Sequence, residues 1–141
     1  MIAVDTNILV YAHRAEQPRH EAAKKRLVAL AEGAGPWAIP VFCLTEFVRV
    51  MTHPRLFDPP FSGEEACIAL ERLFESPSLR VLAPGERFQE LFLEALRSSG
   101  AIGNLVFDAQ IVAVCQEAGT RSLLTEDRDF ARFDDFPVTR L

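Results

Sequence analysis

The stretch Ile2–Val10, IAVDTNILV, joins a short apolar run to three helix-capping side chains. Its first three residues are apolar and mostly β-branched, as in a strand that is covered on both faces. Asp5, Thr6 and Asn7 then precede an apolar run that resumes at Ile8. Because ligands of open α/β sheets bind at the carboxyl ends of the strands, we expect Asp5 to lie at such a crevice. The alternative role of Asp5 is that of an ordinary helix N-cap.

Length and composition predict one globular domain over residues 1–141. The chain is 49% hydrophobic and 25% charged, and no apolar run reaches the roughly 18 to 20 residues that span a bilayer. The formal net charge of -5 argues against a protein that coats nucleic acid, but it is compatible with an enzyme whose acids share one metal pocket. The chain opens without a basic leader followed by an apolar segment, so we expect a cytoplasmic protein that enters no membrane.

Cysteine and histidine spacing favours neither disulfides nor a zinc site. Cys43, Cys67 and Cys115 are widely separated in apolar surroundings, which predicts small core residues in a reducing compartment. The three histidines lack HxxxH spacing, and there is no CxxC.

Hydrophobic periodicity predicts strands that alternate with helices along the rest of the chain. Besides the first strand, strands are expected at Trp37–Pro40, Leu79–Leu82, Arg121–Leu124 and, at an edge, Phe136–Arg140. Besides the helix after Asp5, helices are expected at Pro18–Glu32, Val41–Thr52, Ser62–Ser76, Pro84–Ser99 and Leu105–Ala118. With right-handed crossovers, this alternation gives an α/β fold with a parallel sheet that helices cover on both faces.

Two acids interrupt helices that are otherwise largely apolar. Glu46 has mostly apolar neighbours one turn away, and a carboxylate there is unfavourable unless a cation or hydrogen bonds receive it. Its alternative role is an intrahelical ion pair with Arg49. Asp108 lies one turn beyond Asn104 among aliphatic side chains, where Asp is a poor helix former. These settings favour a site role for Asp108, whereas for Glu46 alone the ion pair and the site are equally good interpretations.

A fourth acid completes a set that needs a cation. Asp127 follows the strand expected at Arg121–Leu124, so it can meet Asp5 at the strand ends, together with the two helical acids. Two like charges about 5 Å apart repel by roughly 3 kcal/mol at an effective dielectric of 20, so such a cluster requires a divalent ion. Oxygen ligands alone favour Mg²⁺ or Mn²⁺. The matching reaction is phosphodiester hydrolysis by a metal-activated water.

Four segments resemble the acidic motifs of PIN-domain ribonucleases, and specifically those of the VapC toxins of toxin-antitoxin pairs: VDTNILVYA, LTEFVRV, GNLVFDAQIVA and LLTEDRDF. They follow one another in the order of that family between Ile2 and Phe130. The resemblance implies a three-layer α/β/α fold around a central, mainly parallel sheet of about five strands. It also implies a Mg²⁺-dependent endoribonuclease, a homodimer, and inhibition by a VapB-type antitoxin whose C-terminal segment covers the active site.

The resemblance assigns catalysis and metal binding to the acids at matching positions, which are Asp5, Glu46, Asp108 and Asp127. Asp129 also fits the last motif, so either Asp127 or Asp129 can be the fourth acid at the metal. Hydrogen bonds to the carboxylates or to metal-bound waters are assigned to Thr6, Asn7, Asn104 and Thr125, each of which could equally be a cap or turn residue. The expected reaction leaves a 5′-phosphate and a 3′-hydroxyl.

Two other functions fit part of the pattern. Phosphatases of the haloacid dehalogenase class also use a strand-end Asp and Mg²⁺, but they need a second Asp two residues later, where this chain has Asn7. A PIN-like domain that binds RNA or a protein partner without cleaving RNA is the non-enzymatic alternative. The presence of all four acids argues against it.

Overall fold

A computed structural model describes all 141 residues. Its five short strands form one sheet and are β1 (Ile2–Val4), β2 (Trp37–Pro40), β3 (Leu79–Leu82), β4 (Ser122–Leu124) and β5 (Val138–Thr139). The strand order is β3-β2-β1-β4-β5, and every neighbouring pair is parallel. The five-stranded parallel sheet expected from the sequence is therefore confirmed. Since β1 is the central strand, its carboxyl end lies in the middle of one edge of the sheet.

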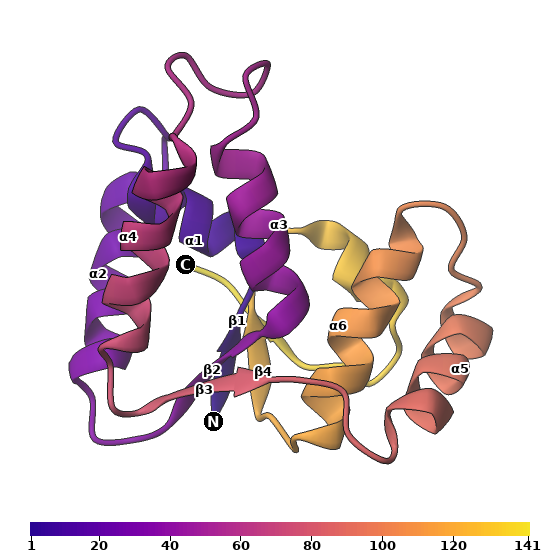
Figure 1. Ribbon diagram of the computed structural model, residues 1–141. Coiled ribbons are helices and arrows are strands. Elements are labelled where there is room, and N and C mark those ends of the chain that lie inside the picture. The colour runs from indigo at the N-terminus through magenta and orange to yellow at the C-terminus, as the bar shows by residue number, and fades with distance from the viewer.

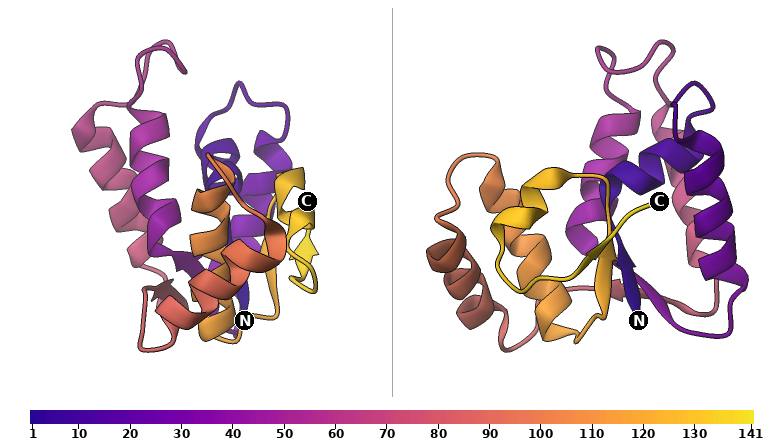
Figure 2. Two further views of the ribbon diagram at one scale, coloured as in Figure 1. Left: turned by 90° about the vertical axis from the view of Figure 1, so that its right-hand side faces the viewer. Right: turned by 180° about the vertical axis from the view of Figure 1, so that it is seen from behind.

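Helices cover both faces of this sheet and are α1 (Thr6–His13), α2 (His20–Glu32), α3 (Val41–Met51), α4 (Gly63–Phe74), α5 (Phe88–Ser99), α6 (Leu105–Glu117) and the short 3₁₀ helix η1 (Arg128–Arg132). Figure 1 shows α2 and α4 on one side of the strands and α5 and α6 on the other, which makes three layers. The views in Figure 2 place η1 beside α6, in agreement with their contacts. No helix combines the length and apolar composition that a bilayer crossing requires.

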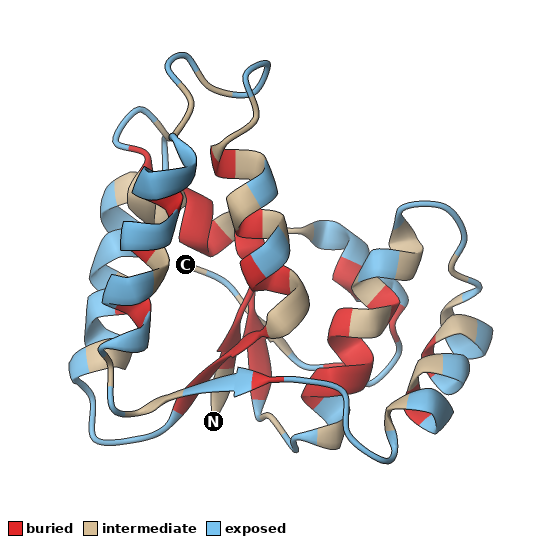
Figure 3. Cartoon of the chain, in the orientation of Figure 1, coloured by how far each residue is buried: buried red, intermediate tan, exposed pale blue.

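The core lies between the central strands and the helices packed against them (Figure 3). All four residues of β2 are buried, and Trp37, Phe47 and Phe130 are the largest side chains that are fully enclosed. The edge strand β3 exposes Arg80 and Val81 instead. The well-packed part of the sheet is thus its centre, where β1 and β4 end.

Three helical segments begin at the carboxyl edge of the sheet, two of them within one residue of the preceding strand and η1 after a three-residue loop. Asp5, Pro40 and Asp127 are the residues that precede α1, α3 and η1. Helix α6 runs in the opposite direction to β4, which follows it, so its first turn returns to the same edge (Figure 1). This topology brings four segments that are distant in sequence to one place.

Most expected element bounds agree with the structure to within about two residues. Two expectations need correction: the start of one helix and the burial of one cysteine. The helix expected from Pro84 begins only at Phe88, because the Glu117 carboxylate accepts 2.8 Å hydrogen bonds from the backbone N–H groups of Gly85 and Arg87 and holds the segment before the helix. Cys43 and Cys115 are buried as expected, but Cys67 is exposed. It faces solvent because α4 buries a different stripe of its surface, formed by Ala66, Ala69 and Leu73.

Candidate active site

A cavity of about 240 Å³ lies at the carboxyl edge of the sheet. Asp5, Glu46, Asp108 and Asp127 all line it, together with Thr6, Asn7, Val10, Tyr11 and Val50. The four acids come from the end of β1, the middle of α3, the first turn of α6 and the residue before η1. The structure therefore brings together all four acids that the sequence predicted for one crevice.

Asp5 is 4% exposed, and both of its carboxylate oxygens accept hydrogen bonds. Oδ1 accepts from the Thr6 backbone N–H at 2.7 Å, so Asp5 does cap α1. Oδ2 accepts from Asn7 Nδ2 at 2.7 Å and from Thr125 Oγ1 at 2.6 Å. Burial raises the pKa of Asp5 to about 6, although the bonds from Thr125 and Thr6 act in the opposite direction. The Asp5 carboxylate therefore serves as the N-cap of α1 and also lines the cavity.

Glu46 combines the two roles that its sequence position suggested. Its Oε1 lies 3.5 Å from Arg49 Nη2, so the intrahelical ion pair exists. The side chains of Glu46 and Arg49 are 42% and 63% exposed, and such exposed pairs contribute little to stability. Oε2 accepts a 3.0 Å hydrogen bond from Thr6 Oγ1. This second bond fixes Glu46 relative to α1 and keeps it at the cavity.

Asp108, Asp127 and Asp129 each offer one carboxylate oxygen, and these oxygens lie within 4.8 Å of one another. The pKa of Asp108 rises to about 7, first because burial removes water and then because Asp127, Asp5, Asp129 and Glu46 repel its charge. Asp127 lines the cavity, whereas Asp129 is exposed at its margin and donates its backbone N–H to Asp127 Oδ1 at 2.8 Å. Both acids thus lie near Asp108.

The donor chemistry of this cluster fits a hard divalent cation. All of its donors are carboxylate oxygens, which are ligands that Mg²⁺ and Mn²⁺ prefer. Burial is the main reason for the raised pKa of Asp108, and repulsion from Asp127, Asp5, Asp129 and Glu46 adds to it. A bound cation would relieve that repulsion.

The predicted supporting residues divide into two groups. Thr6, Asn7 and Thr125 lie among the acids, and the Thr125 hydroxyl accepts from Asn7 Nδ2 and from the Asp127 backbone N–H at 3.0 Å each while it donates to Asp5. Asn104 is exposed, caps α6 with no side-chain hydrogen bond and does not line the cavity. Thr125 does not line the cavity either, but it donates to Asp5, so Asn104 is the one predicted supporting residue whose side chain makes no hydrogen bond to the acids.

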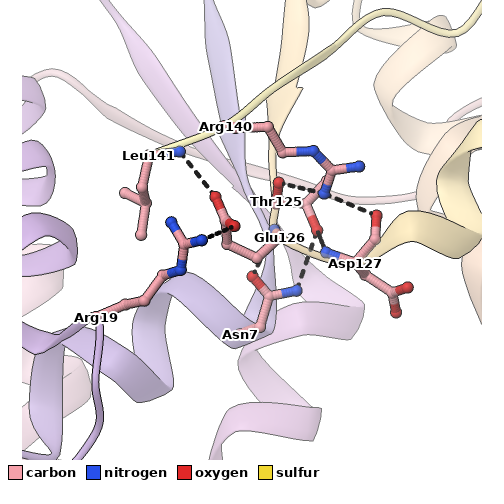
Figure 4. A network of polar contacts seen from close by, with 7 residues as sticks. All are labelled: Asn7, Arg19, Thr125, Glu126, Asp127, Arg140 and Leu141. Atoms are coloured by element: carbon pink, nitrogen blue, oxygen red, sulfur yellow. Dashed lines mark hydrogen bonds and ion pairs between the residues drawn. The ribbon is translucent and has the colours of Figure 1, made fainter.

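Sequence reasoning missed three neighbours of the site. Tyr11 lines the cavity one turn beyond Asn7, and helical spacing alone would have found it. Cys43 Sγ lies 3.6 Å from Asp5 Oδ1 as a weak donor. Arg140 Nη1 donates to the carbonyl oxygens of Thr125 and Asp127, at 2.7 and 2.9 Å (Figure 4). No local sequence motif predicts the contacts of Arg140, because only the pairing of β5 with β4 brings this residue to Thr125 and Asp127.

Comparisons with known proteins agree with this geometry. The model of the PIN domain family matches residues 2–135. Ribonuclease VapC43 of Mycobacterium tuberculosis and VapC ribonuclease Mb2897 of Mycobacterium bovis are each 38% identical to the chain over 133 residues, which is 94% of this chain and 90% of each relative. In the crystal structure of VapBC2 from Rickettsia felis bound to a DNA fragment, a chain with 21% sequence identity shares the fold. Its TM-score is 0.70, and the match covers 99% of this chain and 98% of that one. The chain therefore belongs to the PIN domain family and, within it, to the VapC group.

Proposed function

We propose that this protein is a Mg²⁺-dependent endoribonuclease, the toxin of a VapBC-type pair, folded as a single PIN domain over residues 1–141 and acting on RNA in the cytoplasm. The observation that carries the proposal is the meeting of Asp5, Glu46, Asp108 and Asp127 at one cavity. Its relatives at 38% identity are named as VapC ribonucleases. VapC20 of Mycobacterium tuberculosis, described as a sarcin-ricin loop cleaving toxin, has the same fold with a TM-score of 0.68.

In this proposal the four cavity acids hold Mg²⁺ directly or through water, with Asp129 as the alternative to Asp127, and Mn²⁺ is the natural substitute. Bound there, the ion would lower the pKa of a water and neutralise charge on the phosphoryl oxygens. Attack of that water on the phosphorus, in line with the leaving oxygen, would break the P–O3′ bond and leave a 5′-phosphate on one product and, once the leaving oxygen takes up a proton, a 3′-hydroxyl on the other. Without the ion, the acidic cavity repels an RNA phosphate, so the enzyme needs the metal for substrate binding as well as for chemistry.

The side chains around the acids preorganise this site. Three hydrogen bonds from nitrogen and oxygen donors fix the Asp5 carboxylate, and the Thr6 hydroxyl orients Glu46. The raised pKa of Asp108 means that this carboxyl is partly protonated at neutral pH in the metal-free protein. Metal binding therefore displaces a proton from Asp108, and metal affinity increases with pH.

The partners proposed for this protein are a VapB-type antitoxin and a second copy of the chain. Solved proteins of the same fold are described as VapBC2 from Rickettsia felis and VapBC-1 from nontypeable Haemophilus influenzae, which supports the antitoxin. Ile102 and Phe107, next to and within the first turn of α6, are 82% and 59% exposed. In the proposed homodimer, these two exposed apolar side chains are the residues that we assign to the contact with the second copy.

The test of the nuclease activity compares purified, antitoxin-free protein in Mg²⁺ and in EDTA on a labelled RNA. We expect cleavage in Mg²⁺, none in EDTA, and a loss of about 100-fold or more for Asp108→Asn, since metal stabilisation of the transition state amounts to several kcal/mol. Asp134→Asn is the matched control, because Asp134 is an exposed aspartate outside the cavity, and it should cleave normally. Equal cleavage in EDTA would contradict the mechanism.

The same preparation separates the two rival functions. Hydrolysis of p-nitrophenyl phosphate would favour the haloacid dehalogenase chemistry, although the Asn7 amide is already bonded to Asp5 at the position where that class needs an acid. RNA that stays intact after prolonged incubation with Mn²⁺ would favour a binding domain without nuclease activity.

A further inference from the structure

The segment Thr125–Asp127, between β4 and η1, has five of its six backbone polar groups in hydrogen bonds. The Thr125 N–H donates to the Thr139 carbonyl at 3.0 Å, and the Glu126 N–H donates to Asn7 Oδ1 at 3.2 Å. The Asp127 N–H donates to Thr125 Oγ1 at 3.0 Å. The remaining two bonds come from Arg140. A short loop with so many bonds has little freedom to move Asp127.

Arg140 contributes its two bonds from one atom. Its Nη1 donates to the Thr125 carbonyl at 2.7 Å and to the Asp127 carbonyl at 2.9 Å (Figure 4). These two carbonyls flank Glu126, so the guanidinium closes the backbone turn between them. No other side chain bonds either carbonyl.

Glu126 holds Leu141, the residue that follows Arg140. Its Oε1 accepts from the Leu141 backbone N–H at 2.8 Å, and its Oε2 lies 3.2 Å from Arg19 Nη2 (Figure 4). The Glu126 side chain is 15% exposed, yet it does not line the acidic cavity. Glu126 therefore belongs to the acidic segment LLTEDRDF but not to the candidate metal site. Its bond with the Leu141 N–H links residues 140–141 to the loop a second time, in addition to the two bonds from Arg140.

We propose that Arg140, whose neighbour Leu141 is bonded to Glu126, is a positioning residue for the metal site and that it keeps Asp127 within reach of Asp108. The inference rests on the proposed metal-dependent function. Asp127 and Asp108 already lie close enough to offer oxygens within 4.8 Å of each other, and like charges at that distance push the loop outward when no cation is bound. Arg140 opposes this displacement through the backbone and does not bond the Asp127 carboxylate, whose Oδ1 accepts from the Asp129 N–H.

The direct test is Mn²⁺ binding by isothermal titration calorimetry on the full chain. We expect Arg140→Gln to raise the Kd for Mn²⁺ about 10-fold or more, as for other residues that hold metal ligands in place, and Arg140→Lys to recover part of the loss because it keeps the charge and a donor. Arg121→Gln is the matched control, since Arg121 is an exposed arginine at the other end of β4 with no side-chain hydrogen bond, and it should bind normally. A wild-type Kd in Arg140→Gln overturns the inference, whatever its melting temperature.

Hydrogen exchange supplies a readout that needs no metal. In EDTA, the amides of residues 125–129 should exchange faster in Arg140→Gln than in wild type, with the central strand β1 unchanged. Unchanged exchange in that segment also overturns the inference. If Arg140→Gln does not fold, Glu126→Gln serves instead, because it removes the ion pair with Arg19 and weakens the hold on Leu141. A wild-type Kd in Glu126→Gln then overturns the proposal.

A parallel titration of Asp108→Asn separates this inference from the proposed function. If wild type and Asp108→Asn bind Mn²⁺ equally, the metal site itself is wrong and the role of Arg140 falls with it. If Asp108→Asn loses binding while Arg140→Gln retains it, only the role of Arg140 is wrong.

Discussion

Thr125 Oγ1 lies 2.6 Å from Asp5 Oδ2, although the two residues are 120 positions apart in sequence. The same hydroxyl accepts hydrogen bonds from Asn7 Nδ2 and from the Asp127 N–H, at 3.0 Å each. A hydroxyl has one proton to donate and two lone pairs, so this arrangement uses all of its capacity. One small side chain therefore couples the acid at the end of β1 to the loop that carries Asp127.

Thr125→Val removes this hydroxyl at nearly constant volume. Asp5 then loses a donor in a site where it is 4% exposed, and the Asp127 N–H loses its acceptor. We expect the free energy of unfolding to fall by about 1–3 kcal/mol, the usual effect of leaving buried polar groups unpaired. Urea denaturation in EDTA measures it. Thr125→Ser is the matched control and should stay close to wild type, and an unchanged midpoint for Thr125→Val would show that the hydroxyl bonds do not matter.

The raised acid pKa values predict a pH dependence of metal-free stability. The pKa of Asp5 is about 6 and that of Asp108 about 7 in the folded chain, against an ordinary value of 3.8. Between about pH 4 and pH 7 the folded state therefore binds more protons than the unfolded state, so the free energy of unfolding falls as pH rises through this interval. His13, whose pKa burial lowers, acts in the opposite direction.

Asp108→Asn isolates the contribution of one acid, because His13 and Asp5 are common to both proteins. Measured in EDTA by urea unfolding at several pH values, the stability of the variant relative to wild type should increase from pH 4 to pH 7 and level off above. A difference between the two proteins that stays constant with pH would mean that Asp108 titrates normally.

Removal and return of metal should change the melting temperature. An ion that binds only the folded cluster stabilises by about 2.7 kcal/mol at 100 times its Kd, which for a domain of this size raises the melting temperature by roughly 5 to 10 °C. We expect the shift with millimolar Mg²⁺ in wild type and in the control Asp134→Asn, and its loss in Asp108→Asn. Differential scanning fluorimetry in EDTA and in Mg²⁺ tests this, and the absence of any shift in wild type argues against a preformed metal site.

The acids of the site could be located from sequence because each stands in a conspicuous setting. Asp5 and Asp127 follow buried strands, and the carboxyl ends of parallel strands share one edge of a sheet. Glu46 and Asp108 stand out because they interrupt apolar helices, and the direction of α3 and α6 brings both to that edge. Periodicity and topology suffice for such residues.

Arg140 and Asn104 mark where local patterns fail. The contact of Arg140 depends on β5, whose two residues pair with Leu123 and Leu124, and no periodicity encodes the register of so short a strand. Helical spacing from Asp108 predicts that Asn104 faces the acids, but Asn104 is exposed and does not line the cavity, although α6 begins at Leu105 as expected. Its own backbone dihedrals are helical, with φ -64° and ψ -25°, so helical spacing alone does not determine whether a side chain at the helix end faces the cavity.

The two contacts of Glu46 suggest two different roles, an ion pair with Arg49 and a place at the cavity fixed by Thr6, and mutation can distinguish them. If its role is the ion pair with Arg49, then Arg49→Ala should damage the protein as much as Glu46→Gln does. The pair is exposed and 3.5 Å long, so we expect Arg49→Ala to change the free energy of unfolding by less than about 0.5 kcal/mol and to leave the Kd for Mn²⁺ unchanged. Glu46→Gln should weaken Mn²⁺ binding strongly, since it removes a charge that faces the cavity.

Thr6→Val completes this comparison, because Thr6 Oγ1 donates to the other Glu46 oxygen at 3.0 Å. Without that bond Glu46 keeps its charge but loses its orientation, so we expect Mn²⁺ binding between that of wild type and Glu46→Gln. Calorimetric titration of the three variants ranks them. A ranking in which Arg49→Ala binds less well than Thr6→Val would show that α3, rather than the contact with α1, sets the position of Glu46 at the cavity.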